Sequence, residues 1–148
     1  MPYTPINSTE SRQKTLAVVD GMGGGIGVQL VSGLRQALGE RVTLIALGTN
    51  AIATERMVKA GADSGATGEN AIVRSIGRAG MILGPVGIII GNSMMGEITC
   101  NMAQAILDAD AFRIVLPLQN DHFTLAGIDG LPLAKMIEKA IALAKEHL

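Results

Sequence analysis

The chain has 148 residues, enough for one domain with a substantial buried core. The 12 Lys and Arg residues, set against 13 Asp and Glu, give a formal net charge of -1, which excludes the strongly basic surface that nucleic-acid binding requires. Charged residues make up 17% of the chain, below the roughly 25% of soluble domains, so we expect part of the surface to be buried in a homo-oligomer.

The cysteine content and the N-terminal residues bear on localisation. The single cysteine, Cys100, can form no intramolecular disulfide, which indicates a reducing compartment such as the cytoplasm. Residues 1–14 contain no apolar stretch, so we expect a flexible tail rather than a signal peptide, followed by one domain over residues 15–148. Residues 79–96 carry no charge, but Pro85 and several glycines interrupt them, so we expect no membrane span.

Strands and helices are predicted to alternate in the first half of the chain. Residues 16–19 form a short apolar run typical of a strand buried on both faces. Apolar residues then recur every four positions over residues 26–38, which predicts an amphipathic helix. A second buried strand is predicted at residues 42–47, and Thr49 or Asn50 can cap the helix that follows.

The second half begins with a glycine-rich stretch, residues 61–68, which we interpret as a link to a short helix. A third strand is predicted at residues 81–83, a helical segment at residues 85–98, and a helix capped by Thr99.

The last part of the chain holds two more predicted strands and a final helix. A strand at residues 114–116 is separated by about five residues from another at 123–126. This link is too short for a parallel crossover, so we expect the last strand to lie antiparallel at the edge. Pro132 begins the final helix. The whole pattern predicts a doubly wound, Rossmann-like α/β fold, a three-layer sandwich around a mostly parallel sheet of about five strands.

The loop after the first strand has the composition of a phosphate site. Glycines let the backbone amides approach phosphate oxygens at the positive end of a helix. Asp20, at the start of the loop, would repel phosphate unless a divalent cation, a ribose hydroxyl or a basic group lay between them. The alternative is a ligand-free turn that packs helix against strand. The expected phosphate-binding residues are Gly21, Gly23, Gly24, Gly25, Ile26 and Gly27.

The spacing of these glycines can be compared with the known patterns of nucleotide-binding loops. The pattern G-x-G-x-x-G fails because Ile26 stands at its third glycine, and no Gly-Lys-Ser/Thr follows as in a Walker-type loop. The spacing G-x-x-x-G-I-G over residues 21–27 resembles the cofactor loop of short-chain dehydrogenases/reductases, with Asp20 in place of their Thr. Those enzymes use a Tyr-x-x-x-Lys pair, whereas the only tyrosine here is Tyr3, so the resemblance covers the loop and not the chemistry.

This resemblance implies NADP or NAD as the cofactor. An acidic residue at the end of the second strand usually holds the ribose hydroxyls of NAD, but Gly48, Thr49 and Asn50 are neutral. A phosphorylated ribose would therefore be tolerated better, and Arg56 or Lys59 on the next helix is placed to reach it.

More polar residues are predicted at the same sheet edge, where ligands of open α/β sheets bind. Glu97 and Asp20 are the candidate catalytic residues, and no spacing of His, Asp or Glu indicates a metal site. Helix capping and loop bracing are the alternative roles for these groups, as for Glu69 and Asn70 at a helix start. The remaining expected ligand contacts are Thr49, Asn50, Gly84, Pro85, Asn92 and Ser93.

Three longer segments carry a family resemblance. They are GTNAIAT at 48–54, GATGENAIV at 65–73 and GPVGIIIGNSMMGEIT at 84–99. Together with the glycine loop they resemble a short bacterial family catalogued as domain of unknown function 3842, over residue 16 to the C-terminus. The resemblance implies a bacterial cytoplasmic protein and carries no assigned activity, so it transfers no catalytic role.

Two hypotheses follow. The first is a nucleotide- or dinucleotide-binding protein, and, if an enzyme, an NAD(P)-dependent oxidoreductase. The second is a non-enzymatic oligomeric structural or small-ligand-binding module, in which Met94 and Met95 serve a subunit interface. A small methyltransferase-like binder is a weaker third hypothesis, because the glycine register does not fit it.

Overall fold

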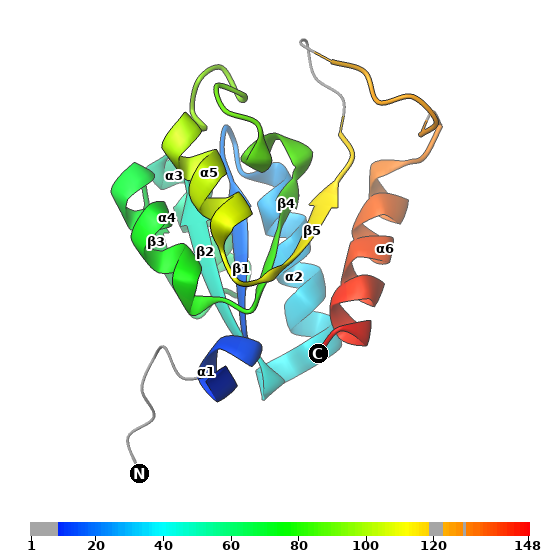
Figure 1. Cartoon of the computed structure of the whole chain (residues 1–148). Coiled ribbons are helices and arrows are strands. Elements are labelled where there is room, and N and C mark those ends of the chain that lie inside the picture. Colours follow the sequence, from blue (N-terminus) through cyan, green and yellow to red (C-terminus); the bar gives the residue numbers. More distant parts are fainter. Residues whose placement is uncertain (1–8, 119–122, 129) are drawn as a thin grey trace.

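The computed structural model describes residues 9–118, 123–128 and 130–148. Five strands form one sheet in which all neighbouring strands are parallel (Figure 1). Their order across the sheet is β3-β2-β1-β4-β5. The strands are β1 (Thr15–Asp20), β2 (Thr43–Gly48), β3 (Ser64–Thr67), β4 (Met81–Pro85) and β5 (Phe112–Leu116).

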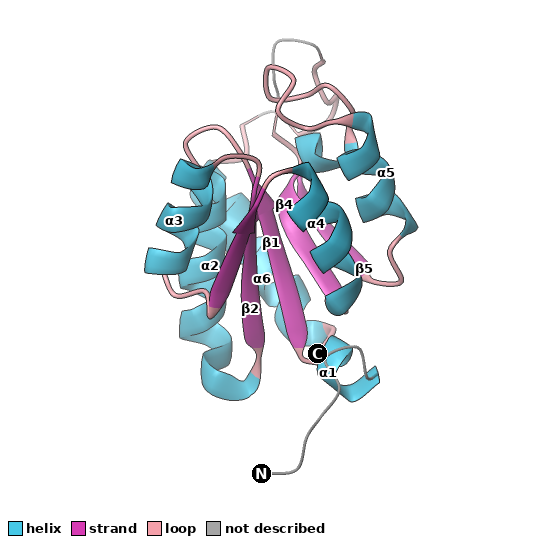
Figure 2. Ribbon diagram, turned by 90° about the vertical axis from the view of Figure 1, so that its left-hand side faces the viewer, coloured by secondary structure: helices cyan, strands magenta, loops and turns pink. Residues whose placement is uncertain are grey.

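Helices cover both faces of this sheet, which gives the expected three layers (Figure 2). One face packs against α2 (Gly25–Leu38), α3 (Ala51–Lys59) and α6 (Leu133–Glu146). The other packs against α4 (Glu69–Ser75) and α5 (Cys100–Asp108). Shorter elements are α1 (Thr9–Gln13), η1 (Gly39–Arg41), η2 (Ile76–Arg78) and η3 (Val86–Ile89).

The central strand β1 explains why the layers form. Successive side chains of a strand point to opposite faces, so Leu16 and Val18 enter the core beneath α2, while Ala17 and Val19 enter the core on the α5 side. All four are fully buried, as the continuous apolar run predicted. None of the helices in the described ranges is long and apolar enough to cross a membrane.

The fifth strand is not the one that the sequence predicted. Residues 64–67, interpreted above as part of a link, form β3 and pair in parallel with β2. Their sequence, Ser-Gly-Ala-Thr, lacks the apolar alternation that signals a strand. Gly65 is needed there because a Cβ atom would lie 2.7 Å from the side chains of Thr54 and Val58 on α3. Close packing against α3 therefore requires small residues here, and these lack the apolar alternation by which a strand is predicted.

The predicted antiparallel edge strand at residues 123–126 is wrong. These residues contain only an isolated bridge at Phe123, and β5 is the outer strand on that side. The short link showed only that a strand pair, if formed, would be antiparallel. It did not show that a pair forms. Residues 119–122, which belong to the predicted link, lie outside the described residues.

Two further segments, one beside the strand ends and one in the N-terminal tail, also differ from the prediction. The helical segment predicted at 85–98 is helical only in η3, because Pro85 completes β4 and the residues after Ile89 form turns. Residues 9–13, expected in the flexible tail, form α1, where Arg12 pairs with Asp110 at 3.3 Å. Residues 1–8 lie outside the described part of the chain.

Candidate functional site

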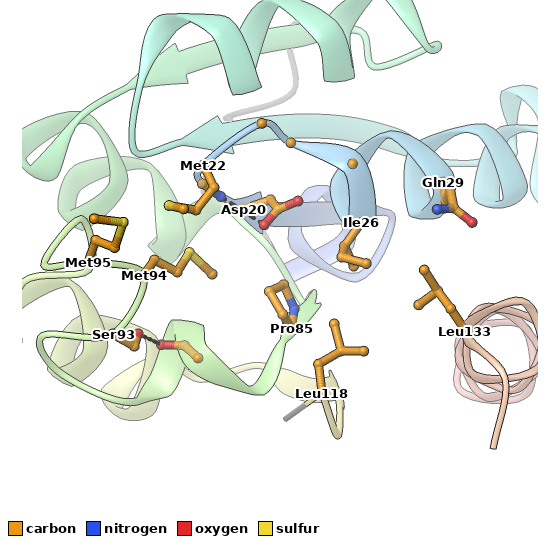
Figure 3. A pocket seen from close by; sticks show the side chains of 15 residues that line it. Asp20, Met22, Ile26, Gln29, Pro85, Ser93, Met94, Met95, Leu118 and Leu133 are labelled. Carbon is orange, nitrogen blue, oxygen red and sulfur yellow. Dashed lines mark hydrogen bonds between the residues drawn. The ribbon is translucent and has the colours of Figure 1, made fainter. Parts of the chain in front are cut away.

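The candidate site lies where the strand order reverses. The chain runs from β1 outward to β2 and β3, then returns to β4 and β5 on the other side of β1. Ligands of open α/β sheets bind beyond the carboxyl ends of the strands at such a point. A cavity of about 500 Å³ lies there. Figure 3 shows Met22, Met94 and Met95 at one end of it and Leu118 and Leu133 at the other.

Asp20 lines this cavity and joins the end of β1 to the start of α2 by hydrogen bonds. Its Oδ1 accepts a hydrogen bond from the Gly21 amide at 2.8 Å, and its Oδ2 accepts one from the Gly27 amide at 2.7 Å. Gly27 is the third residue of α2, whose amide is one of those that an N-cap side chain normally binds. The N-cap residue Gly24 has no side chain, so Asp20 takes over that role from the end of β1.

The glycines of the loop differ in whether backbone conformation or close packing would exclude a side chain. Gly24 adopts a left-handed φ of 73°, and a Cβ atom there would lie 2.9 Å from the Ala53 backbone. A Cβ atom on Gly27 would collide with the sulfur of Met57 on α3. A Cβ atom on Gly25, by contrast, would meet nothing within 4 Å, although Gly25 lines the cavity. Gly24 and Gly27 therefore serve packing, and Gly25 faces open space.

Burial raises the pKa of Asp20, which is only 4% exposed. Hydrogen bonds from the amides of Gly27, Gly21 and Ile26 act in the opposite direction without cancelling it, and the nearby charge of Glu97 adds a further increase. Asp20 is thus a carboxylate held at a helix N-terminus, where the helix dipole favours its charge.

The loop offers fewer free amides than the sequence suggested. The amides of Gly21 and Gly27 bind Asp20, the Gly24 amide binds the Gly21 carbonyl oxygen, and the Ile26 amide is directed at Asp20. The amides of Gly23 and Gly25 donate no hydrogen bond to any described residue. The expected cradle of six residues, 21 and 23–27, is therefore reduced to these two glycines.

Glu97 joins three loops at the neighbouring strand end. Its Oε1 accepts hydrogen bonds from the Thr49 hydroxyl at 2.5 Å and from the Asn50 side-chain amide and the Met22 backbone amide, both at 2.9 Å. Partial burial alone would raise the pKa of Glu97, but the hydrogen bonds from Thr49, Met22 and Asn50 outweigh it, so the pKa is lowered.

Some of the predicted ligand contacts line the cavity, and others do not. Asp20, Pro85, Ser93 and the glycine loop up to Ile26 line the cavity, whereas Gly27 does not. The buried Ser93 hydroxyl donates to the Gly87 carbonyl oxygen. Thr49, Asn50 and Glu97 are brought together as predicted, but they bind one another outside the cavity lining. Gly84 lies inside β4 against the Val19 carbonyl oxygen, and Asn92 is exposed, so neither lines the cavity.

The basic residues proposed to reach a ribose phosphate are placed elsewhere. The Arg56 guanidinium donates to the carbonyl oxygen of Gly23 in the glycine loop, and Lys59 forms a surface ion pair with Glu55 at 2.9 Å. Glu69 accepts a hydrogen bond from the Thr99 hydroxyl at 2.8 Å and so braces the start of α5. Cys100 is exposed. No group of three or more His, Cys, Asp or Glu side chains among the described residues could hold a metal ion.

Seven residues of the cavity lining were not among the predicted ligand contacts. They are Met22, Gln29, Gly87, Met94, Met95, Leu118 and Leu133. Gln29 follows Gly25 by one helical turn, so helical spacing could have placed it beside the loop. Leu118 follows the end of β5, which the rule for ligand sites could have suggested. Leu133 begins α6, and nothing in its local sequence indicates its position.

Strained backbone occurs in the wall of the cavity and beside it. Among the described residues, four other than glycine have a left-handed φ, with values from 51° to 69°. Met22, Met94 and Met95 line the cavity, whereas Asn92 is exposed outside its lining. Each such residue costs about 1–3 kcal/mol and persists only where its surroundings enforce it. Such positions are concentrated at functional sites, and three of these four residues lie in residues 91–98 beside the cavity.

Comparisons with known proteins show the family and the fold. The chain belongs to the family described as a domain of unknown function, DUF3842, whose model matches residues 15–148. No curated protein matches it. A similar solved structure is described as a dodecameric FMN-dependent Ubix-like decarboxylase from Escherichia coli O157:H7, with a TM-score of 0.53 and 13% identity, covering 89% of this chain and 92% of that one. At this identity the likeness shows the shared fold alone.

Replacing Asp20 by Asn is expected to alter the pH dependence of stability in a defined direction. Because the folded-state pKa of Asp20 lies above its ordinary value of 3.8, the folded protein binds more protons than the unfolded chain between the two values. The contribution of Asp20 to stability therefore falls as the pH rises through this window. Asp20→Asn lacks this decline, although its amide group leaves one loop amide poorly paired, at a cost of about 1–3 kcal/mol.

Urea denaturation of both proteins at several pH values measures the effect. The difference in unfolding free energy between wild type and Asp20→Asn should shrink as the pH rises. The control is Asp108→Asn, which changes an exposed carboxylate on α5. A difference for Asp20→Asn that stays constant or grows with pH would contradict the assignment.

Proposed function

We propose that this member of the DUF3842 family binds a nucleotide-type ligand in the cavity beyond β1 and β4. The observation that carries the proposal is the coincidence of three features at one point. They are the reversal of strand order, an open cavity, and two amides at the N-terminus of a 14-residue helix that donate to no described residue. Binding sites in open α/β sheets combine these features.

The apolar part of the cavity suits a planar ring. Ile26, Pro85, Leu118 and Leu133 contribute apolar surface, and the methionine side chain of Met94 can adapt to an irregular ligand. A volume of about 500 Å³ is within the range of small-molecule sites, which are mostly apolar with a few polar groups that fix orientation. Gln29 and Ser93 are such polar groups in the lining.

The phosphate is assigned to the amides of Gly23 and Gly25. They lie at the positive end of α2, and the Arg56 guanidinium, on the Gly23 carbonyl oxygen, is the basic group nearest to this glycine. The negative charge of Asp20 opposes a phosphate, but both of its oxygens already accept hydrogen bonds from the amides of Gly21 and Gly27.

We take FMN as the first ligand to test. The similar solved structure is described as FMN-dependent, and its fold is shared. NAD and NADP, implied by the resemblance of the glycine loop to short-chain dehydrogenases/reductases, form the comparison. Asp20 and Glu97 are assigned structural roles, because their oxygens hold loops together, and this proposal includes no oxidoreductase reaction.

A thermal-shift titration tests this proposal. A ligand at about 100 times its dissociation constant stabilises a protein by about 2.7 kcal/mol, which should raise the Tm by about 5–10 °C. Gly25→Val should abolish the shift without unfolding the protein, because its side chain would project into open space at the phosphate position. The control is Gly77→Val, where a side chain also meets nothing but lies on η2, away from the cavity. Absence of a shift with FMN, NAD and NADP would contradict the proposal, and a shift that survives in Gly25→Val would place the ligand elsewhere.

We also propose that the chain forms a homo-oligomer. Large apolar side chains are exposed at the carboxyl edge of the sheet: Met95 is 88% exposed, Ile52 66% and Met22 46%. Contiguous exposed apolar side chains often mark contacts between subunits. The sparse charge of the whole chain supports the same interpretation.

Native mass spectrometry measures the subunit number directly. We expect more than one subunit in the wild type, dissociation in the variant Ile52→Lys/Met95→Lys, and no change in Val73→Lys, which places a charge at a half-exposed apolar position on α4. A monomeric wild type at micromolar concentration would contradict the oligomer.

A further inference from the structure

The β2 side of the ligand crevice is closed by the protein itself. In dinucleotide-binding folds of this kind, one half of the ligand lies over the end of the second strand, where an acidic side chain binds a ribose. Here the hydroxyl of Thr49 donates to Glu97, and the side-chain nitrogen of Asn50 donates both to Glu97 and to the Met22 carbonyl oxygen. The side-chain oxygen of Asn50 caps α3 through the Ala53 amide. The hydrogen-bond donors of both side chains are therefore already engaged.

Residues 91–98, which carry Glu97, are held in position by backbone hydrogen bonds and by one buried side chain. Residues 91–98 are tied together by backbone hydrogen bonds, including Asn92 amide to Ile98 carbonyl at 2.7 Å and Glu97 amide to Met94 carbonyl at 3.0 Å. The fully buried Ile98 anchors the segment in the core on the α5 side. Among the described residues, the only hydrogen bonds from this segment to the β1–α2 and β2–α3 loops are those of Glu97.

We propose that Glu97 determines the length of the ligand. By fixing residues 91–98 against the ends of β1 and β2, it leaves the cavity on the β1 and β4 side open to one nucleotide and excludes the second nucleotide of a dinucleotide. Its carboxylate also places a negative charge where a second phosphate would approach. Glu97 thus determines specificity without acting on the ligand chemically. This inference rests on the proposed function.

The test compares two ligands that differ in length. FAD is FMN extended through its phosphate by an adenylate group, so both present the same ring. The wild type is expected to bind FMN at least about tenfold more tightly than FAD. Glu97→Ala should reduce this preference by at least about tenfold through tighter FAD binding, with little change for FMN, and Glu97→Gln, which keeps one acceptor oxygen, should lie between them. The control, Glu55→Ala, removes an exposed carboxylate on α3 and should behave as wild type.

Two results in this titration would overturn the inference. One is a wild type that binds FAD as tightly as FMN. The other is a Glu97→Ala variant that binds FMN and still rejects FAD. Failure of the wild type to bind either flavin or a nicotinamide nucleotide would instead count against the proposed function.

A second measurement tests the closure without any ligand. Hydrogen exchange of the amides of residues 92–98 should be at least about tenfold faster in Glu97→Ala than in wild type and Glu55→Ala, because the segment loses its hydrogen bonds to the neighbouring loops. Unchanged exchange would show that Glu97 does not hold the segment, and the inference would fail whatever ligand the cavity binds.

Discussion

The hydrogen bonds between the Asp20 carboxylate and the amides of Gly21 and Gly27 set the geometry on which the site depends. They join the last residue of β1 to the first turn of α2, so strand and helix meet at a fixed angle. Because Asp20 supplies the cap, the loop can use glycine at the N-cap, and Gly24 can turn in a left-handed conformation against α3. The same bonds occupy the amides of Gly21 and Gly27, whereas the amides of Gly23 and Gly25 donate to no residue in the described ranges.

Glu97 has a complementary role on the other side of the loop. Asp20 is buried and acts within one β–α unit, whereas Glu97 is partly exposed and joins three separate loops. Their environments shift the two pKa values in opposite directions: burial raises the pKa of Asp20, whereas for Glu97 the hydrogen-bond donors together outweigh burial and lower the pKa. Elsewhere such a pair can indicate an acid and a base, but here the bonded oxygens indicate two structural carboxylates that shape one cavity.

The sequence was sufficient to predict the layers of the fold and to place the glycine loop at the carboxyl edge of the sheet, where the cavity lies. Buried strands such as β1 and amphipathic helices such as α2 follow from apolar periodicity, and the glycine loop lies where such folds bind ligands. Periodicity failed at β3, because close packing against α3 replaces apolar residues by small ones. It also failed at residues 85–98, where apolar residues at helical spacing lie largely in turns closed by backbone hydrogen bonds within the segment.

The details of the site could not be predicted for a related reason. That Thr49, Asn50 and Glu97 share one sheet edge follows from strand order, but that they bind each other depends on how residues 91–98 fold back. The neutral end of β2 suggested room for a phosphorylated ribose. The structure instead brings the carboxylate of Glu97 to that position from a different loop.

We assign the phosphate of a bound nucleotide to the amides of Gly23 and Gly25. An NMR titration of the ¹⁵N-labelled protein with FMN tests it most directly, since each amide reports separately. We expect large, saturable shifts for the amide signals of Gly23 and Gly25, a smaller shift for Gly27, whose amide stays bonded to Asp20, and none for Gly77 on η2. Saturation of binding with the Gly23 and Gly25 signals unmoved would contradict it.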